Sequence, residues 1–221
     1  MEKKMDLKKI SIIALLSALA FLMVAVIRIP VVAFLKYEPK DVIIVIGGFI
    51  YSPLVSIIIS VFSSLLEMLT ISETGIIGAV MNIVSSCAFA VTAAFIYSRK
   101  KSINKALLSL IIGTFVMVII MLLWNYFLTP IYMGYPREAV AAMLLPQFLP
   151  FNLIKGILNT AITMLIYKPL VTALRKAGLV KLSEDHTSGT ITKANRTGII
   201  ILSVFLLITS VLAILVMQKV I

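Results

Sequence analysis

Long apolar runs recur along this chain, and they restrict what it can fold into. About 20 apolar residues cross the ~30 Å hydrocarbon core of a bilayer as a helix, and the first and last such runs occupy residues 10–29 and 198–217. Hydrophobic residues make up 61% of the chain, above the roughly half that is usual in a soluble domain. The alternating pattern of a membrane β-barrel is absent from the sequence. The sequence therefore predicts an all-α integral membrane protein.

Composition argues against several other classes of protein. The net charge of +11 comes from basic residues that flank apolar runs and form no continuous stripe, so we expect the lipid bilayer, and no nucleic acid, as a partner. The single Cys87 and the single His186 cannot supply a disulfide framework or a zinc site. No Gly-x-Ser-x-Gly elbow or phosphate-binding glycine loop is present, so we expect neither an enzyme nor an ATP-binding chain.

An ambiguous run at residues 42–67 decides the topology. It could form one helix, or two helices broken at Pro53, because proline disfavours helix for the residue before it. Two helices place residues 1–9, 99–105 and 168–196 in the cytoplasm, and these segments hold four, four and six of the 20 basic residues. Cytoplasmic loops carry an excess of Lys and Arg. We therefore predict two helices, with a cytoplasmic N-terminus, in a multi-pass protein of the plasma membrane.

This topology predicts a six-helix transmembrane bundle followed by a seventh transmembrane helix. The expected helices cover residues 10–29, 42–51, 53–69, 75–97, 104–128, 150–173 and 198–217. An outer loop is expected at 129–146. We divide the chain into a six-helix membrane domain (1–178), a polar cytoplasmic linker (179–197) and an additional transmembrane helix (198–217). No chemistry is assigned to the additional helix, because it carries no polar residue beyond Ser and Thr.

The sixth predicted helix places polar side chains on one face. Pro150 suits the first turn of a helix, where its missing N–H would be unpaired anyway. Asn152, Lys155 and Asn159 then recur at i, i+3 and i+7, which share a face. A cation inside a membrane costs a few kcal/mol unless it meets water, a partner or a ligand. We therefore predict that this face lines a cavity.

Further polar residues gather in the outer half of the predicted bundle and on its outer loops. Those that we expect near the cavity are Tyr37, Lys40, Asp41, Glu67, Asn82 and Asn125. An ion pathway or proton relay would need ionisable groups at the midplane and beyond, so this one-sided polarity favours an outward-facing binding pocket. For Asn82, Asn125 and Lys155, hydrogen bonding between helices is an equal alternative. The outer residues expected only to cap helix ends are Glu38, Glu73 and Arg137.

Small residues form a stripe on the first predicted helix. Ala14 and Ala18 lie four residues apart, and their small side chains would let another helix approach closely. From the residues alone, packing inside the chain's own bundle is the favoured interpretation of this stripe.

Five segments, taken in order, carry a resemblance to a known family. They are Ala14-x-x-x-Ala18, Tyr37-Glu38-Pro39-Lys40-Asp41, Gly47-Gly48-Phe49-Ile50-Tyr51-Ser52-Pro53, Thr70-Ile-Ser-Glu-Thr-Gly75 with Met81-Asn82, and Pro150-Phe151-Asn152-x-x-Lys155-Gly156. With this order and spacing, residues 8–178 resemble the substrate-binding S component of energy-coupling factor (ECF) vitamin transporters. The resemblance is strongest to the members of the family that bind riboflavin.

The resemblance implies a six-helix bundle that holds one vitamin near its outer face. It also implies docking on a transmembrane scaffold subunit, EcfT, driven by two ATP-binding subunits, with Ala14 and Ala18 as the docking face. The implied ligand is riboflavin, which is transported and is not a cofactor. The expected ligand contacts are Asn125, Asn152 and Lys155, with Asn82 next and with Lys40 and Asp41 as loop contacts that close over the pocket.

The chemistry of these side chains agrees with a flavin but does not single it out. Amide side chains can match the imide edge of the ring, Lys155 can donate to a ring carbonyl, and aromatic residues can cover the ring. The same groups would suit another vitamin. The other function classes considered are a stand-alone secondary carrier and a membrane enzyme, which would have to rest on Glu67 and Lys155 alone.

Overall fold

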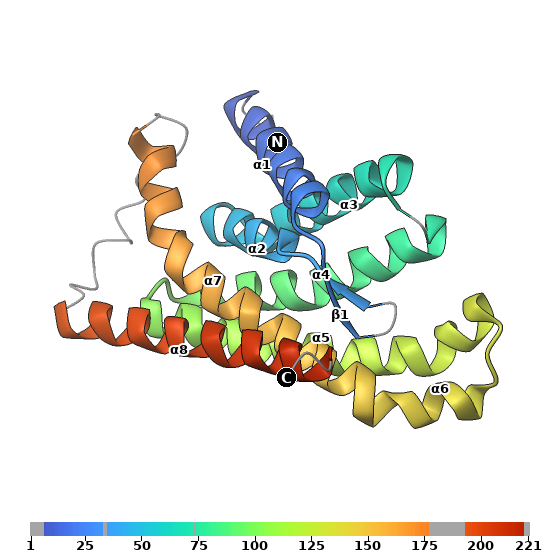
Figure 1. The fold of residues 1–221 in the computed structure, drawn as a ribbon. Coiled ribbons are helices and arrows are strands. Elements are labelled where there is room, and N and C mark those ends of the chain that lie inside the picture. Colours follow the sequence, from blue (N-terminus) through green and yellow to red (C-terminus); the bar gives the residue numbers. More distant parts are fainter. Residues whose placement is uncertain (1–6, 33–34, 73, 177–192, 219–221) are drawn as a thin grey trace.

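The computed structural model describes residues 7–32, 35–72, 74–176 and 193–218, which form helices and one small sheet (Figure 1). In chain order the elements are α1 (Leu7–Val26), β1 (Ile29–Val32), β2 (Leu35–Tyr37), α2 (Lys40–Ile50), α3 (Pro53–Thr70), α4 (Gly75–Arg99), α5 (Ile103–Met133), α6 (Arg137–Met143), the π-helical turn η1 (Leu144–Phe148), α7 (Leu149–Lys176) and α8 (Lys193–Met217).

The predicted all-α membrane bundle is confirmed. Within the described residues, six stretches are long and apolar enough to cross a membrane: α1, α3, α4, α5, the segment 137–173 from α6 into α7, and residues 200–217 of α8. Helix α2 does not reach that length, because its 11 residues cover only about 16 Å at ~1.5 Å per residue. The chain is therefore a multi-pass membrane protein with one short helix inside its bundle.

The chain breaks between α2 and α3 at Pro53, as predicted. The preceding residue is extended, with φ −173° and ψ 162°, and Pro53 opens α3, where no backbone N–H is needed. Although α2 is short, it lies at the centre of the bundle, since every residue from 40 to 49 is buried. A Cβ at Gly48 would collide with Ser56 and Ala94. Glycine therefore allows α2 to pack closely on both α3 and α4.

The outer loop predicted at 129–146 is wrong, because most of this segment is helical. Helix α5 continues to Met133 and ends at Gly134, whose φ of +67° is a left-handed conformation that glycine adopts easily. Helix α6 then leads through η1 into α7 without an intervening loop. Pro146, the last residue of the predicted loop, lies within the π-helical turn. The Ala, Met and Leu residues around it are strong helix formers.

The connection between α1 and α2 contains a β-hairpin that the sequence analysis did not predict. Strands β1 and β2 are antiparallel, with Ile29 opposite Tyr37 and Pro30 opposite Lys36. Val31, Leu35 and Tyr37 are buried, and they join an apolar cluster with side chains of η1 and α7. The hairpin therefore packs on one end of the helical bundle.

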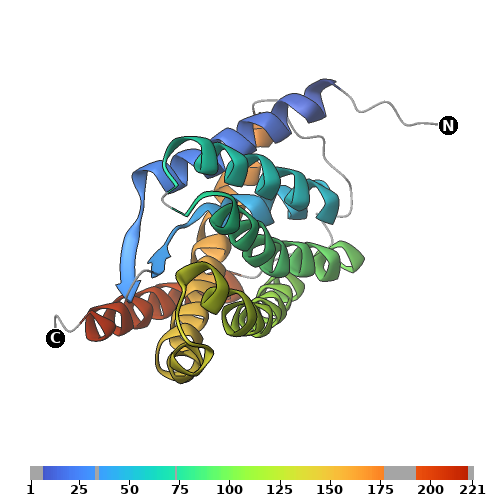
Figure 2. The same ribbon diagram turned by 90° about the vertical axis from the view of Figure 1, so that its right-hand side faces the viewer.

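Helix α8 lies along α7 and contacts β1 near its C-terminal end. Both ribbon views place it on the opposite side of the bundle from α1 (Figures 1 and 2). Residues 179–192 of the predicted linker, including His186, lie outside the described residues. The helix itself begins at Lys193, five residues before the predicted start.

Candidate functional site

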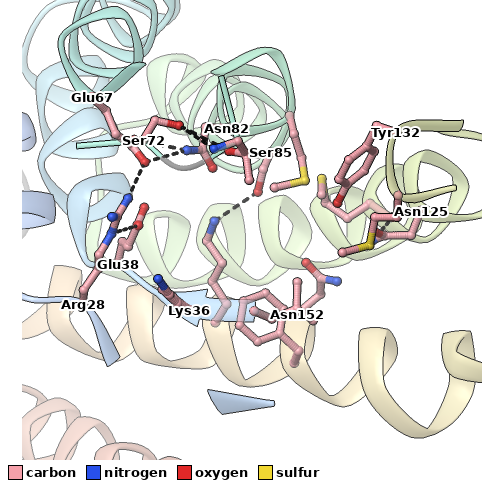
Figure 3. Close-up of a pocket in the computed structure, with 17 residues that line it drawn as sticks. Arg28, Lys36, Glu38, Glu67, Ser72, Asn82, Ser85, Asn125, Tyr132 and Asn152 are labelled. Carbon is pink, nitrogen blue, oxygen red and sulfur yellow. Dashed lines mark hydrogen bonds and ion pairs between the residues drawn. The ribbon is translucent and has the colours of Figure 1, made fainter. Parts of the chain in front are cut away.

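A cavity of about 170 Å³ lies between the hairpin and helices α3, α4, α5 and α7 (Figure 3). Five residues predicted near a cavity line it, namely Glu67, Asn82, Asn125, Asn152 and Lys155. Its apolar and aromatic lining consists of Leu35, Met81, Met121, Tyr132, Met133 and Phe151. A few placed polar groups among apolar walls are typical of a site for a small organic ligand.

Lys155, on α7, connects the cavity to the centre of the bundle. Its Nζ lies 3.2 Å from the Oδ2 atom of Asp41 and donates a hydrogen bond of 3.1 Å to the Oγ atom of Ser85. An ammonium group has three N–H donors, so one donor is left over after these two contacts. Because Lys155 lines the cavity, this donor is available to a ligand.

Asp41 is the anchor beneath Lys155. It is fully buried and accepts hydrogen bonds from the Ser86 hydroxyl and from Asn159 Nδ2 at 3.1 Å. Tyr37 donates to Asn159 Oδ1 at 3.0 Å. Burial, and then the charge of Asp41, raise the pKa of Tyr37 far above its ordinary value, so its phenol keeps this proton. These residues fix Lys155 in position without lining the cavity.

Two asparagines leave part of their hydrogen-bonding capacity to the cavity. Asn125 Nδ2 donates to the Met121 carbonyl at 2.7 Å, and Thr129 donates to Asn125 Oδ1 at 2.9 Å. Asn152 Nδ2 donates to the Phe148 carbonyl at 2.7 Å. Each amide carries two N–H groups, so each keeps one. No side chain of the described residues donates to Asn152 Oδ1, which leaves an acceptor beside these donors.

A second cluster of charged side chains, around Glu67, occupies the other end of the cavity, away from Asn125 and Asn152 (Figure 3). Glu67 accepts from Lys40 at 2.6 Å, from Arg28 at 2.9 Å and from Asn82 at 3.0 and 3.1 Å. Arg28 also pairs with Glu38 at 2.8 Å. Burial lowers the pKa of Arg28, but Glu38 and Glu67 raise it by more, so its guanidinium stays charged.

The formal charges of the side chains paired around Lys155 and around Glu67 cancel. Arg28, Lys40 and Lys155 stand against Glu38, Asp41 and Glu67, and each of these six side chains contacts a partner of opposite charge. Pairing is what makes buried charge tolerable. The groups therefore need no charged ligand to balance them.

Three predicted residues lie elsewhere than expected. Lys40 and Asp41 are not loop contacts that close over the pocket, because they form the first turn of α2 and are 1% and 0% exposed. Together with Tyr37 they lie beneath the cavity and outside its lining. The hairpin brings the chain inward before α2 begins, which is why these residues are buried.

The residues expected only to cap helix ends have different environments. Glu38 was wrongly assigned to this role, because it pairs with Arg28 and lines the cavity. Arg137 begins α6 and lies over the Tyr126 ring at 5.7 Å. Glu73 lies outside the described residues. The sequence analysis also missed Arg28 and Ser85. The only sequence signal for either residue was that a polar side chain lies in or beside an apolar run.

Comparison with known proteins identifies the family. The family model described as "ECF transporter, substrate-specific component" matches residues 8–167. The chain belongs to this family. The predicted resemblance is therefore confirmed, and the matched residues run from the start of α1 to about two thirds of the way along α7.

Individual members of the family are similar over most of their length. Riboflavin transporter FmnP of Bacillus subtilis is 30% identical, over 78% of this chain and 98% of that protein. Riboflavin transporter RibU of Staphylococcus aureus is 31% identical, over 76% of this chain and 93% of that protein. These relatives are transport components.

A solved structure supports the same assignment. It is described as the structure and mechanism of the S component of a bacterial ECF transporter, and it matches with a TM-score of 0.65 and 30% identity. The match covers 98% of that chain but only 76% of this one. The family match ends at residue 167, before α8 begins.

Proposed function

We propose that this chain is the riboflavin-binding S component of an ATP-driven ECF importer. The observation that carries the proposal is the convergence of Asn125, Asn152 and Lys155 on one cavity of an S-component fold. The named relatives are riboflavin transporters, which supports riboflavin over another vitamin. Riboflavin is the cargo here, and we propose no cofactor and no catalytic step.

The unused groups in the cavity match the edge of a flavin ring. The imide edge of riboflavin is one N–H donor between two carbonyl acceptors. Asn152 Oδ1 can accept from that N–H, while the remaining N–H groups of Asn125, Asn152 and Lys155 can donate to the carbonyls. Phe151 and the methionines of the lining can pack on the ring.

The charged end of the cavity suits the polyhydroxyl tail of the same ligand. Arg28, Glu38, Glu67 and Asn82 offer donors and acceptors there, and their ion pairs are complete without the ligand. A neutral ligand that has one flat, polar-edged end and one hydroxylated end can therefore occupy the cavity without breaking these ion pairs.

We further propose that transport depends on the scaffold subunit EcfT and two ATP-binding subunits. Ala14 and Ala18 lie on the exposed face of α1, whereas Ile13 and Leu16 face the core. Exposed small residues on a membrane helix allow another helix to pack closely, which supports a docking role over internal packing. The proposed location is the cell membrane, with the N-terminus in the cytoplasm and the cavity open to the outside.

The decisive experiment is a titration of riboflavin with the purified protein. Binding should quench flavin fluorescence, because the ring becomes enclosed beside Phe151 and Tyr132. Riboflavin methylated at the imide nitrogen should bind at least about tenfold more weakly, since the N–H that Asn152 accepts is gone. Equal binding of the methylated compound would refute the assignment of the imide edge to Asn152.

Other results would select the alternatives. Binding of a different vitamin, with no binding of riboflavin, would keep the S component and overturn the substrate. Concentrative uptake by this chain without the scaffold and ATP-binding subunits would identify a secondary carrier. Conversion of the ligand into a new product would identify a membrane enzyme.

A further inference from the structure

Helix α8 contacts the hairpin that forms one wall of the cavity. Ile214, in the last turns of α8, is buried in the same apolar cluster as Val31 of β1 and Leu35 of β2. Gln218, just past the end of the helix, donates its side-chain amide to the backbone carbonyl of Pro30. The C-terminal end of α8 is therefore joined to β1 by packing and by a hydrogen bond.

The hairpin residue that Gln218 contacts pairs with a residue that lines the ligand cavity. Pro30 is paired across the hairpin with Lys36, and both Lys36 and Leu35 line the cavity. A shift of β1 away from α8 would carry β2 with it, because the strands are hydrogen-bonded neighbours. The position of α8 therefore bears directly on the position of the cavity wall.

The hairpin is short, so its stability depends on the elements that pack against it. It is a short two-stranded ribbon of four and three residues, and an isolated ribbon of this size is at best marginally stable. The family match ends at residue 167, before α8 begins. This chain therefore has a support for its hairpin that the matched six-helix domain does not include.

We propose that Ile214 and Gln218 are positioning residues that hold the β1–β2 hairpin against the bundle and so slow release of the ligand. This inference rests on the proposed function, because the ligand used to measure release is riboflavin. The contact between α8 and the hairpin can be measured without any ligand. Failure of one proposal can therefore be distinguished from failure of the other.

The first test compares dissociation rates of riboflavin in the full chain. The double variant Ile214→Ala with Gln218→Ala should release riboflavin roughly tenfold faster, which corresponds to the loss of a modest share of apolar burial and one hydrogen bond. Val216→Ala is the matched control, since Val216 lies on the same turn but is 58% exposed. The control should release riboflavin at the wild-type rate. A double variant that does the same overturns the proposal.

The second test reads the hairpin position directly. Cysteines at Val32 and Met217, which pack on the same apolar cluster, are joined by a short thiol cross-linker in a Cys87→Ala background. The double variant should lower the cross-linking yield, while Val216→Ala should not. Equal cross-linking yields with and without the Ile214→Ala and Gln218→Ala substitutions overturn the proposal, even if the protein binds no flavin. A lowered yield in a protein that binds no flavin would support the positioning role and refute only the substrate.

Discussion

The ammonium of Lys155 lies 3.2 Å from the carboxylate of Asp41, and this ion pair joins α7 to the first turn of α2. Because Ser85 takes a second donor, Lys155 is held from two sides and presents its remaining N–H to the cavity. The proposed ligand contact is thus positioned by Asp41, which lies outside the cavity lining, and by Ser85, which lines the cavity. Stability and binding can be separated by comparing a change of Asp41 alone with a change of both partners.

Replacing Asp41 by Asn should destabilise the protein by about 3–5 kcal/mol, because it leaves the Lys155 charge buried without a partner. Thermal unfolding in detergent measures this effect. Combining Asp41→Asn with Lys155→Met should restore much of the stability but not the affinity for riboflavin. An Asp41→Asn protein as stable as wild type would show that Lys155 is not charged in this site.

Asn152→Ala and Lys155→Met should each weaken riboflavin binding by roughly ten- to a hundredfold, because each removes a partner of a buried hydrogen bond worth ~1–3 kcal/mol. Fluorescence titration provides the measurement. Lys100→Met, at an exposed lysine beyond α4, is the control for loss of a positive charge and should leave the affinity unchanged. If Lys155→Met binds riboflavin as tightly as wild type, the lysine has no contact with the ligand.

Ala14→Leu with Ala18→Leu should block assembly with the scaffold subunit, because the larger side chains hold the two helices apart. Riboflavin affinity of the isolated chain should stay within about twofold of wild type, since both positions are exposed on α1. Co-purification with EcfT and the fluorescence titration test the two halves of this expectation. Loss of riboflavin affinity with intact assembly would show that these alanines pack inside the chain's own bundle.

Cysteine labelling tests the proposed orientation. A single cysteine at Lys101, in a Cys87→Ala background, should be protected from an impermeant reagent in intact cells, because the segment 99–105 carries four basic residues. A cysteine at Tyr135, an exposed residue between α5 and α6, should be labelled. The reverse pattern would invert the topology and place the cavity on the cytoplasmic side.

Much of the fold follows from hydropathy and proline placement. The break at Pro53 depends on local backbone chemistry, and the shared face of Asn152 and Lys155 depends on helical periodicity alone. Both features are local in sequence. For the same reason, membrane spans and one wall of the cavity could be read from the sequence before any contact between helices was known.

The parts that sequence analysis missed depend on contacts between distant segments. Glu38 resembles an ordinary polar residue at a helix end, and only its pairing with Arg28 brings it to the cavity. Lys40 and Asp41 follow a polar connection and look like loop residues, yet the hairpin turns the chain inward and buries both. Polarity indicates that a residue needs a partner, but it does not indicate where that partner lies.

The short helix α2 also constrains the order in which the chain can enter the membrane. Its first turn carries Lys40 and Asp41, and an unpaired charge in the hydrocarbon core is costly. The partner of Lys40 is on the next helix, but Lys155 and Asn159 emerge from the ribosome only with α7. A nascent chain that stops before α7 is therefore expected to leave α2 outside the hydrocarbon core. We therefore expect insertion of α2 and completion of the binding site to occur together, late in biogenesis.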